Sequence, residues 1–319
     1  MSKTSVATLS VASNGLLTVG KLIIGLMTGS VSIISEGVHS GIDLLASVIA
    51  LFAVKESAKP ADIRHAYGHG KIENVSGTIE AALIFVAAIW IFVEAVQKIT
   101  KGVRVENYNF GLLIMGLSAV CNLLISSLLM KVAKETDSVA LEADALHLRT
   151  DVYTSAGVFA GLLLMRLTGW EILDPLVAMG VALLIVKAAF DLTKEAFMPL
   201  VDTALPVAEQ EIISSIINRH AHQFVEFHKL RTRKAGSERY IDLHLVVPKY
   251  ASVVEVHELC DQIEMEVNQE IPGTSVLIHA EPCAKLEEKC RLCKEAQECN
   301  YCLGEKTCRG TGQEQESDR

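Results

Sequence analysis

The sequence of 319 residues lacks the motifs of several enzyme classes. It has no nucleophile elbow, no phosphate-binding loop and no pair of carboxylates placed for acid–base catalysis. These absences argue against an enzyme. Acidic residues also outnumber basic residues. The net charge is −9, and most of the acidic excess lies after residue 200. We therefore expect no nucleic-acid partner for that part of the chain.

Aromatic residues are few, at 5 %, whereas 50 % of the residues are hydrophobic and the mean hydropathy is +0.34. This composition is unusual for a soluble globular protein and favours an α-helical membrane protein. The first hydrophobic stretch lacks the short charged region, the compact apolar core and the small-residue cleavage site of a signal peptide. We therefore expect this stretch to remain in the chain.

Hydrophobic stretches long enough to cross a bilayer, which takes about 20 residues, run over 6–27, 31–54, 75–98, 110–132, 139–166 and 172–193. These six spans place both termini on one side of the membrane. The connections on that side carry Lys55, Lys59, Arg64, Lys71, Lys131, Lys134 and Lys194, against Lys98, Lys101, Arg104 and Arg166 on the other side. The excess predicts cytoplasmic N- and C-termini.

A polar sequence of mixed periodicity begins at "PLVDTALP", Pro199 to Pro206. Helical spacing over 207–220 is followed by the alternating segments "FHKLRTRKAG" and "RYIDLHLVVP", the helical "SVVEVHELCDQIEMEVNQEI" and a last strand, "SVLIHAEP". The order is α-β-β-α-β. We expect a six-helix transmembrane domain over 1–200, a cytoplasmic α+β domain over 201–284, and a Cys-rich tail with a disordered end over 285–319.

Two matched His–Asp pairs interrupt the hydrophobic spans: His39 and Asp43 in "SEGVHSGIDLLASV", and His147 and Asp151 in "LHLRTDVYTS". Residues four apart share a helix face. Both pairs lie roughly 15 Å deep at 1.5 Å per residue, where ionisable groups are costly and mark ion or proton paths. Two imidazoles and two carboxylates match the tetrahedral shell of zinc. Each pair could instead be a hydrogen-bonded polar pair within its own span.

A second group of ligand-type residues lies in the connection between the second and third spans, "KPADIRHAYGHGKIEN". Asp62, His65 and His69 are three and four positions apart, so one turn or a compact loop could bring them to one cation. Three ligands leave an open position, as in labile sites. The alternative is a solvated polar loop with freely titrating histidines.

The α+β region holds His228, His244, His257 and His279 on different expected elements, and Glu281 follows the last of them. Each histidine taken singly is more often a structural residue than a ligand. Together with the carboxylate, they indicate a shared site for one or two metal ions.

The tail "CRLCKEAQECNYCLGEKTC" places Cys290, Cys293, Cys299 and Cys302 in two C-x-x-C pairs. In a reducing compartment, this spacing favours a tetrathiolate zinc site over disulfides. An iron–sulfur cluster and a tail of reduced, unliganded thiols remain as alternatives.

Six motifs together resemble the cation diffusion facilitators, which are proton-coupled exporters of divalent metals: "GLMTGSVSIISEGVHSGIDLLAS", "ADIRHAYGHGKIEN", "EADALHLRTDVYTSAGV", "LVDTALP", "HKLRTRKAG" and "IHAEPC". The similarity covers residues 5–283. It implies a homodimer in the lipid of the inner (plasma) membrane, a metallochaperone-like cytoplasmic domain, and metal efflux by alternating access in exchange for protons.

The resemblance also implies roles for individual residues. His39, Asp43, His147 and Asp151 match the transport site; Asp62, His65 and His69 match the loop site of bacterial zinc exporters; His228, His244, His257 and His279 match a binuclear site that bridges the two cytoplasmic domains; Lys71 and Asp202 match an interdomain charge pair. Glu281 stands where members often have aspartate. The Cys-rich tail is not part of the common family pattern.

Histidine in both halves of the transport site favours zinc, both as cargo and as structural ion, with cadmium and cobalt as further cargo. Iron and manganese fit this ligand set less well. A membrane-anchored metal sensor or scaffold is the alternative from another functional class. Such a protein has no need of a metal site at the midplane of the membrane.

Overall fold

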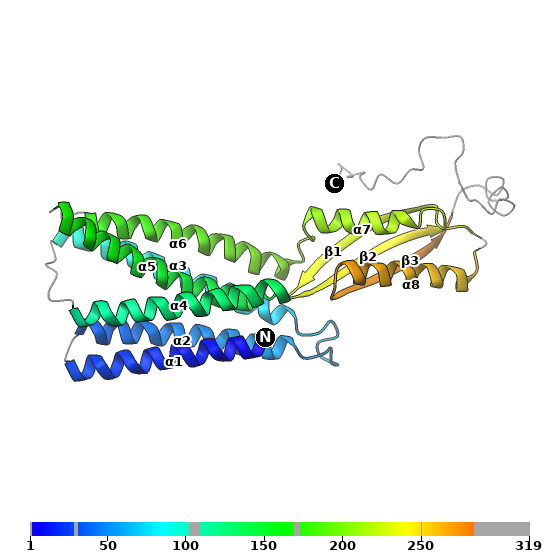
Figure 1. Cartoon of the computed structure of the whole chain (residues 1–319). Helices are drawn as coiled ribbons and strands as arrows, with labels where there is room; N and C mark the ends of the chain where they lie inside the picture. Colours follow the sequence, from blue (N-terminus) through cyan, green and yellow to red (C-terminus); the bar gives the residue numbers. More distant parts are fainter. Residues whose placement is uncertain (1, 29–30, 102–108, 169–172, 250, 284–319) are drawn as a thin grey trace. The chain divides into compact units, whose positions relative to one another are not determined.

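The computed structural model describes residues 2–28, 31–101, 109–168, 173–249 and 251–283. The chain divides into two compact units, Met1–Val201 and Asp202–Arg319. Each unit has its own arrangement of elements, shown in Figure 1.

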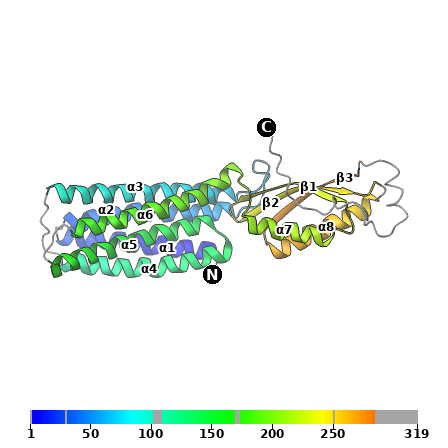
Figure 2. The same ribbon diagram turned by 90° about the horizontal axis from the view of Figure 1, so that it is seen from above.

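Long α-helices make up the described part of the first unit. They are α1 (Lys3–Thr28), α2 (Val31–Ser57), α3 (Lys71–Lys101), α4 (Asn109–Thr136), α5 (Val139–Thr168) and α6 (Leu173–Phe197), followed by the 3-10 turn η1 (Met198–Val201). The helices run side by side in Figures 1 and 2. The main packed pairs are α1 with α2, α3 with α6, and α4 with α5. Within the described residues, all six predicted hydrophobic stretches are therefore helical.

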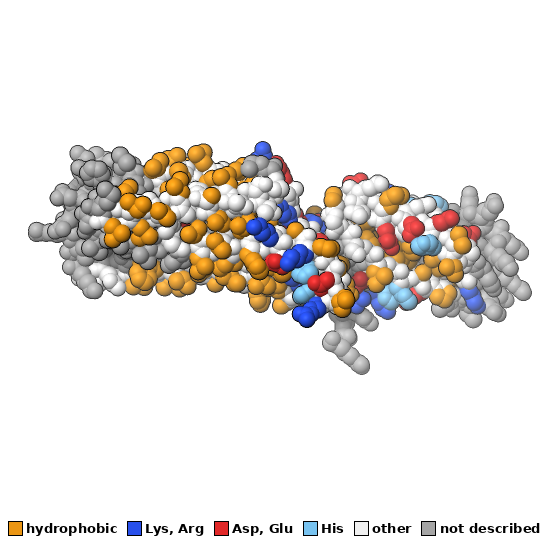
Figure 3. All heavy atoms as spheres, turned by 90° about the horizontal axis from the view of Figure 1, so that it is seen from below, with side chains coloured by type: hydrophobic (Ala, Val, Ile, Leu, Met, Phe, Trp, Pro, Cys, Tyr) orange, Lys and Arg blue, Asp and Glu red, His pale blue; other side chains and the backbone are white. Residues whose placement is uncertain are grey.

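Much of the surface of this unit is apolar, as Figure 3 shows for one face. Within the described residues, four stretches are long and apolar enough to cross a membrane: Lys3–Ile24, Lys71–Gln97, Gly116–Thr136 and Leu176–Val201. The helices α2 and α5 are not among these four stretches, and part of each lies outside the residues whose side chains are described. These are the two helices on which the predicted His–Asp pairs lie.

Small residues let α3 approach α5 and α6 closely. At Gly77, a Cβ atom would meet Val139 Cγ1 at 2.9 Å and Ala196 Cβ at 3.1 Å. One turn further along α3, Ala81 and Ile84 pack with Ala143 of α5 in a shared apolar cluster. The two helices therefore pack closely along these turns.

The second unit has the predicted order α-β-β-α-β. Its elements are α7 (Val207–Arg219), β1 (Glu226–Ala235), β2 (Glu238–Val247), α8 (Val253–Glu270) and β3 (Thr274–Pro282). The sheet order is β1-β2-β3, with β1 antiparallel and β3 parallel to β2. Gly236 makes the β1–β2 turn with a φ of +62°, which glycine adopts without steric cost.

Both helices of this unit lie on one face of the sheet, as Figure 2 shows. The core joins Ile213 and Ile217 of α7, Leu259 and Ile263 of α8, and the strand residues Ile241, Leu243 and Leu245. Since side chains alternate along a strand, His244 points to the face that the helices leave uncovered.

Candidate functional site

The membrane helices bring one residue of each predicted His–Asp pair together. Asp43 of α2 and His147 of α5 are each only 5 % exposed, and His147 Nε2 lies 3.2 Å from Asp43 Oδ1. The other imidazole nitrogen, His147 Nδ1, is buried without a hydrogen-bond partner among the described residues. This pair offers nitrogen and oxygen ligand atoms within the packed bundle.

The other half of the predicted transport site is described in part. Asp151 lies one turn after His147 on α5 and is half-buried. Its Oδ2 accepts a hydrogen bond of 3.4 Å from Asn122 Nδ2 on α4. His39 belongs to α2, and its side chain lies outside the described residues. The predicted pairing of four ligands therefore stays a prediction, whereas Asp43 and His147 are in contact.

The Asp62 loop folds around backbone hydrogen bonds that precede α3. Gly68 N–H donates to the His65 carbonyl at 2.9 Å, and Gly68 has a φ of +78° that favours glycine. The Ile72 N–H donates to the His69 carbonyl at 3.0 Å, so His69 stands just before the first turn of α3. The loop thereby brings the imidazole rings of His65 and His69 together, with their centroids 4.3 Å apart.

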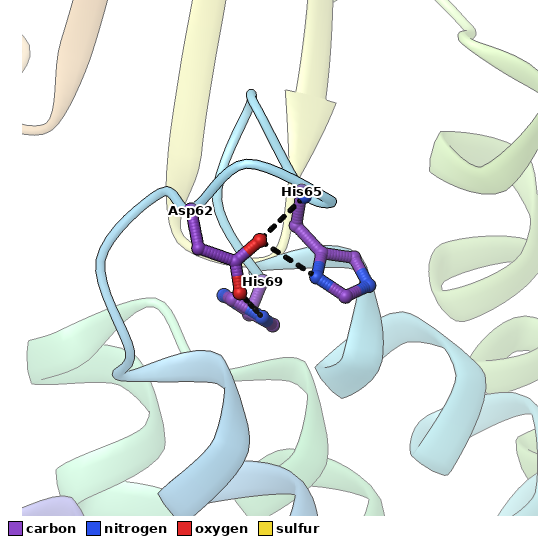
Figure 4. Close-up of side chains that lie close together, drawn as sticks. All are labelled: Asp62, His65 and His69. Carbon is purple, nitrogen blue, oxygen red and sulfur yellow. Dashed lines mark hydrogen bonds and ion pairs between the residues drawn. The ribbon is translucent and has the colours of Figure 1, made fainter.

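Asp62 links the two histidines, as Figure 4 shows. Its Oδ1 lies 3.2 Å from His65 Nδ1, and its Oδ2 lies 3.5 Å from His69 Nε2. Ligand atoms of all three residues lie within 4.8 Å of one another. The backbone N–H groups of His65 and Arg64 donate to Asp62 Oδ1, and these hydrogen bonds lower the pKa of the carboxyl. Asp62 is therefore ionised at neutral pH, as a metal ligand must be.

A row of three histidines crosses the uncovered face of the sheet. In the strand register, His228 of β1 lies opposite His244 of β2, and His244 lies opposite His279 of β3. The ring centroids are 5.4 Å apart for His228 and His244, and 4.9 Å apart for His244 and His279. Neighbouring strands are about 4.8 Å apart, so this register alone brings the imidazoles together.

Glu281 completes this row from the same face of β3. Its Oε1 lies 2.6 Å from His244 Nδ1 and 3.7 Å from His279 Nε2, while its Oε2 lies 3.5 Å from His228 Nε2. The hydrogen bond with His244 lowers the pKa of Glu281. The ligand atoms of His228, His244 and Glu281 lie within 4.8 Å of one another.

A β-bulge sets the direction of His228. The register of β1 against β2 shifts between His228 and Arg231, and Lys229 has a φ of +52°. A non-glycine residue in this conformation is strained, and bulges of this kind re-aim a neighbouring side chain. The strain is concentrated beside the histidine that meets Glu281.

Three groups of predicted site residues are not brought into these clusters. His257 lies on α8, with its side chain 73 % exposed and 3.6 Å from Asp261, on the helix-covered side of the sheet. Cys290, Cys293, Cys299 and Cys302 lie outside the described residues. Asp202 forms an ion pair of 3.4 Å with Arg233 of β1. The pairing of Asp202 with Lys71 would join the two units and stays a prediction.

Comparison with known proteins identifies relatives of both units. Residues 7–201 match the cation efflux transmembrane domain, and residues 205–283 match the cytoplasmic domain of cation efflux proteins. An uncharacterized transporter of Synechocystis sp. is 37 % identical over 256 residues, which are 80 % of this chain and 83 % of that protein. The cation-efflux pump FieF of Salmonella choleraesuis and of Salmonella typhimurium is 32 % identical over 284 residues, 89 % of this chain and 93 % of the pump.

A solved structure of CzrB, described as a candidate zinc transporter, is 36 % identical to this chain. It covers 25 % of this chain and 100 % of its own length, and its TM-score is 0.25. This score is too low to support an argument from its fold.

Proposed function

The chain belongs to the cation efflux family, the cation diffusion facilitators, and we propose that it exports zinc in exchange for protons. Members of this family are membrane transporters of divalent metal cations and not enzymes. The matching cytoplasmic domain is of a type that dimerises.

The buried contact between Asp43 and His147 is the observation that carries this proposal. An imidazole and a carboxylate in the interior of a helical bundle are costly unless they serve an ion or a proton. Their nitrogen and oxygen atoms suit zinc, which takes four such ligands. His39 and Asp151, each four residues from one member of the contact, are the proposed remaining ligands.

The same four residues supply the proposed coupling to protons. Imidazole and carboxylate bind either a metal ion or protons, so the arrival of protons favours release of the metal. We also propose that the protein is a homodimer in the inner membrane. Both termini are expected in the cytoplasm, because the connections on that side carry more Lys and Arg than those on the other side.

The loop cluster and the sheet cluster are proposed as further zinc sites. Each offers two imidazoles and one ionised carboxylate with ligand atoms within 4.8 Å, and this donor set fits zinc. In the loop, the buried His69 Nδ1 lacks a partner among the described atoms. The cysteine pairs of the tail are proposed to hold a zinc ion in regulation or delivery, outside the transport path.

Transport assays in proteoliposomes test this function. With an imposed pH gradient, we expect zinc to move against the proton flow, with cadmium and cobalt next and with iron and manganese slower. Zinc movement that is indifferent to the pH gradient would contradict proton exchange. A faster flux of iron or manganese than of zinc would contradict the proposed cargo.

Replacing His69 with Ala is expected to remove one bound zinc ion per protomer and to leave transport at saturating zinc largely intact. The change leaves Asp62 and His65, two mostly exposed ligands that water competes with. Metal content after equilibrium dialysis measures the loss. His222→Ala, at an exposed position after α7, is the matched control. An unchanged zinc content in His69→Ala would show that the loop holds no zinc.

Replacing Glu281 with Gln is expected to weaken zinc binding at the sheet cluster by about 10- to 100-fold, the usual effect of losing a group that orients metal-binding histidines. The carboxylate contacts all three histidines of the row, and an amide keeps the shape without the charge. Calorimetric titration of the full chain with zinc measures the change. Glu270→Gln, exposed at the end of α8, is the control. Equal affinities in the two variants would contradict the site.

A further inference from the structure

A buried polar network joins three helices of the bundle beside the proposed transport site. Ser10 and Asn14 of α1, Ser47 of α2 and Asp144 of α5 are each at most 4 % exposed. None of these four residues is a proposed metal ligand. Polar side chains are costly within a membrane-spanning bundle, so a network of this kind calls for a role.

Ser47 is the centre of this network. Its Oγ donates to Asp144 Oδ1 at 2.8 Å, and it accepts hydrogen bonds from Asn14 Nδ2 at 2.6 Å and from Ser10 Oγ at 3.2 Å. A hydroxyl group has one donor and two acceptor positions, so all three positions of Ser47 are used. The rotation of this hydroxyl is therefore fixed, and its one hydrogen is directed at α5.

Helix α1 also holds α2 on the other side of Asp43. Thr18 Oγ1 donates to the Ser40 carbonyl at 2.9 Å, and Lys21 Nζ donates to Ser40 Oγ at 2.7 Å. Ser40 lies three residues before Asp43, and Ser47 lies four residues after it. Hydrogen bonds between α1 and α2 therefore flank Asp43 on both sides and support the helix that carries it.

Two polar contacts connect this supported part of α2 to α5. The first is the contact of Asp43 with His147, at 3.2 Å, and the second is the Ser47–Asp144 hydrogen bond, at 2.8 Å. The contacts are four residues apart on α2, about 6 Å, and three residues apart on α5, about 4.5 Å. A single contact lets two helices rotate and slide, whereas two contacts about one turn apart fix both their rotation and their register.

From this arrangement we infer that Ser47 and Asp144 are positioning residues for the transport site. Their hydrogen bond sets the distance and the orientation of His147 on α5 relative to Asp43 on α2. This inference rests on the proposed role of Asp43 and His147 as metal ligands. A metal site requires its ligands to be held within about 0.5 Å of the productive geometry, so a change one turn away reduces the affinity for the metal.

The acceptor atom of Asp144, and not its charge, carries this role. Asp144 Oδ1 accepts the hydrogen bond from Ser47, whereas Oδ2 is buried without a hydrogen-bond partner among the described atoms. Asn offers an acceptor oxygen at the same position, and Leu has a similar size without an acceptor. Asp144→Asn should therefore preserve the transport site, whereas Asp144→Leu and Ser47→Ala should both weaken it.

Zinc binding to the full chain in lipid nanodiscs, measured by equilibrium dialysis, tests the positioning role. The component of the wild-type binding curve that is lost in Asp43→Asn belongs to the transport site. In Asp144→Leu and in Ser47→Ala, this component should move to about 10- to 100-fold higher zinc, while Asp144→Asn should follow the wild type. Ser126→Ala is the matched control and should also follow the wild type, because this equally buried hydroxyl donates to the Leu123 carbonyl within α4.

Two outcomes of the binding experiment overturn the inference. The first is a transport-site component that is unchanged in both Asp144→Leu and Ser47→Ala. The second is an Asp144→Asn curve as weak as that of Asp144→Leu, which would show that the charge matters and the hydrogen bond does not. Thermal unfolding without zinc identifies a variant that does not fold. If Asp144→Leu does not fold, Ser47→Ala, which only removes a hydroxyl, decides the result.

Transport assays in proteoliposomes separate this inference from the proposed function. Asp144→Leu should raise the zinc concentration of half-maximal flux by the same factor as in the binding curves and should lower the maximal flux less, because saturating zinc refills the weakened site. A loss of maximal flux at an unchanged half-maximal concentration would overturn the positioning role. A wild type that moves no zinc would contradict the proposed function, and the binding curves would still decide whether Ser47 and Asp144 position the ligands.

Discussion

Replacing Asp43 with Asn is expected to reduce zinc efflux by about a hundredfold, the upper end of the usual loss when a group at a metal site is changed. Asn keeps the size of the side chain but removes the negative charge beside His147 Nε2, 3.2 Å away. The amide offers a weaker oxygen ligand, and it cannot take up a proton when the metal leaves. Zinc binding and proton uptake are therefore both impaired by this one substitution.

The fold should survive this change, because the buried side chain loses a charge and gains no volume. Burying a neutral amide costs less than burying an unpaired carboxylate. Zinc flux into proteoliposomes, measured beside thermal unfolding in detergent, separates loss of transport from loss of structure. Asp191→Asn, on an exposed position of α6, makes the same chemical change away from the site and should keep full flux. Near-normal flux in Asp43→Asn would remove Asp43 from the transport site.

The local sequence patterns predict the elements of this fold well. Each hydrophobic stretch is long enough to be a membrane helix by itself, so its structure depends little on distant residues. In β2, the alternation of Ile241, Leu243 and Leu245 with polar residues already assigns His244 to the opposite face. Such patterns can be recognised from the order of neighbouring residues alone.

The histidine row depends on strand register, which local patterns do not contain. His228, His244 and His279 come from three strands, and the bulge after His228 shifts the register of β1 against β2. The residue types and the family resemblance therefore group His257 with them, although α8 holds it on the helix-covered side in the described chain. Ligands of one site need not share a local motif.

Burial of acidic residues in the bundle is also a property of the tertiary structure. Glu80 and Asp144 are visible in the sequence as charges within hydrophobic stretches, but they have no matched spacing of the kind that singles out the His–Asp pairs. Both are fully buried where small residues let α3 approach α5 closely, as at Gly77. The same holds for Asn122, which reaches Asp151 from α4 and has no signal in the sequence.

Replacing His147 with Asp is expected to shift the metal preference of the transporter from zinc toward manganese. The change exchanges a nitrogen ligand for a hard carboxylate oxygen opposite Asp43, and oxygen ligands suit manganese better than they suit zinc. The flux of zinc should fall by about tenfold or more, the scale of altering one group at a metal site, while the flux of manganese relative to zinc rises.

The comparison with His147→Asn separates ligand type from ligand loss in this prediction. Asn supplies a neutral oxygen at the same length as Asp, so it should slow both metals and leave their ratio without a shift toward manganese. Flux of each metal in proteoliposomes at equal pH gradients measures the ratio. In the Asp variant two carboxylates face each other within the bundle, and this repulsion is relieved only by a cation or a proton. A zinc-to-manganese ratio equal to that of the unmodified protein would show that His147 does not set the choice of metal, and the selectivity would then have to lie with His39 or outside the transport site.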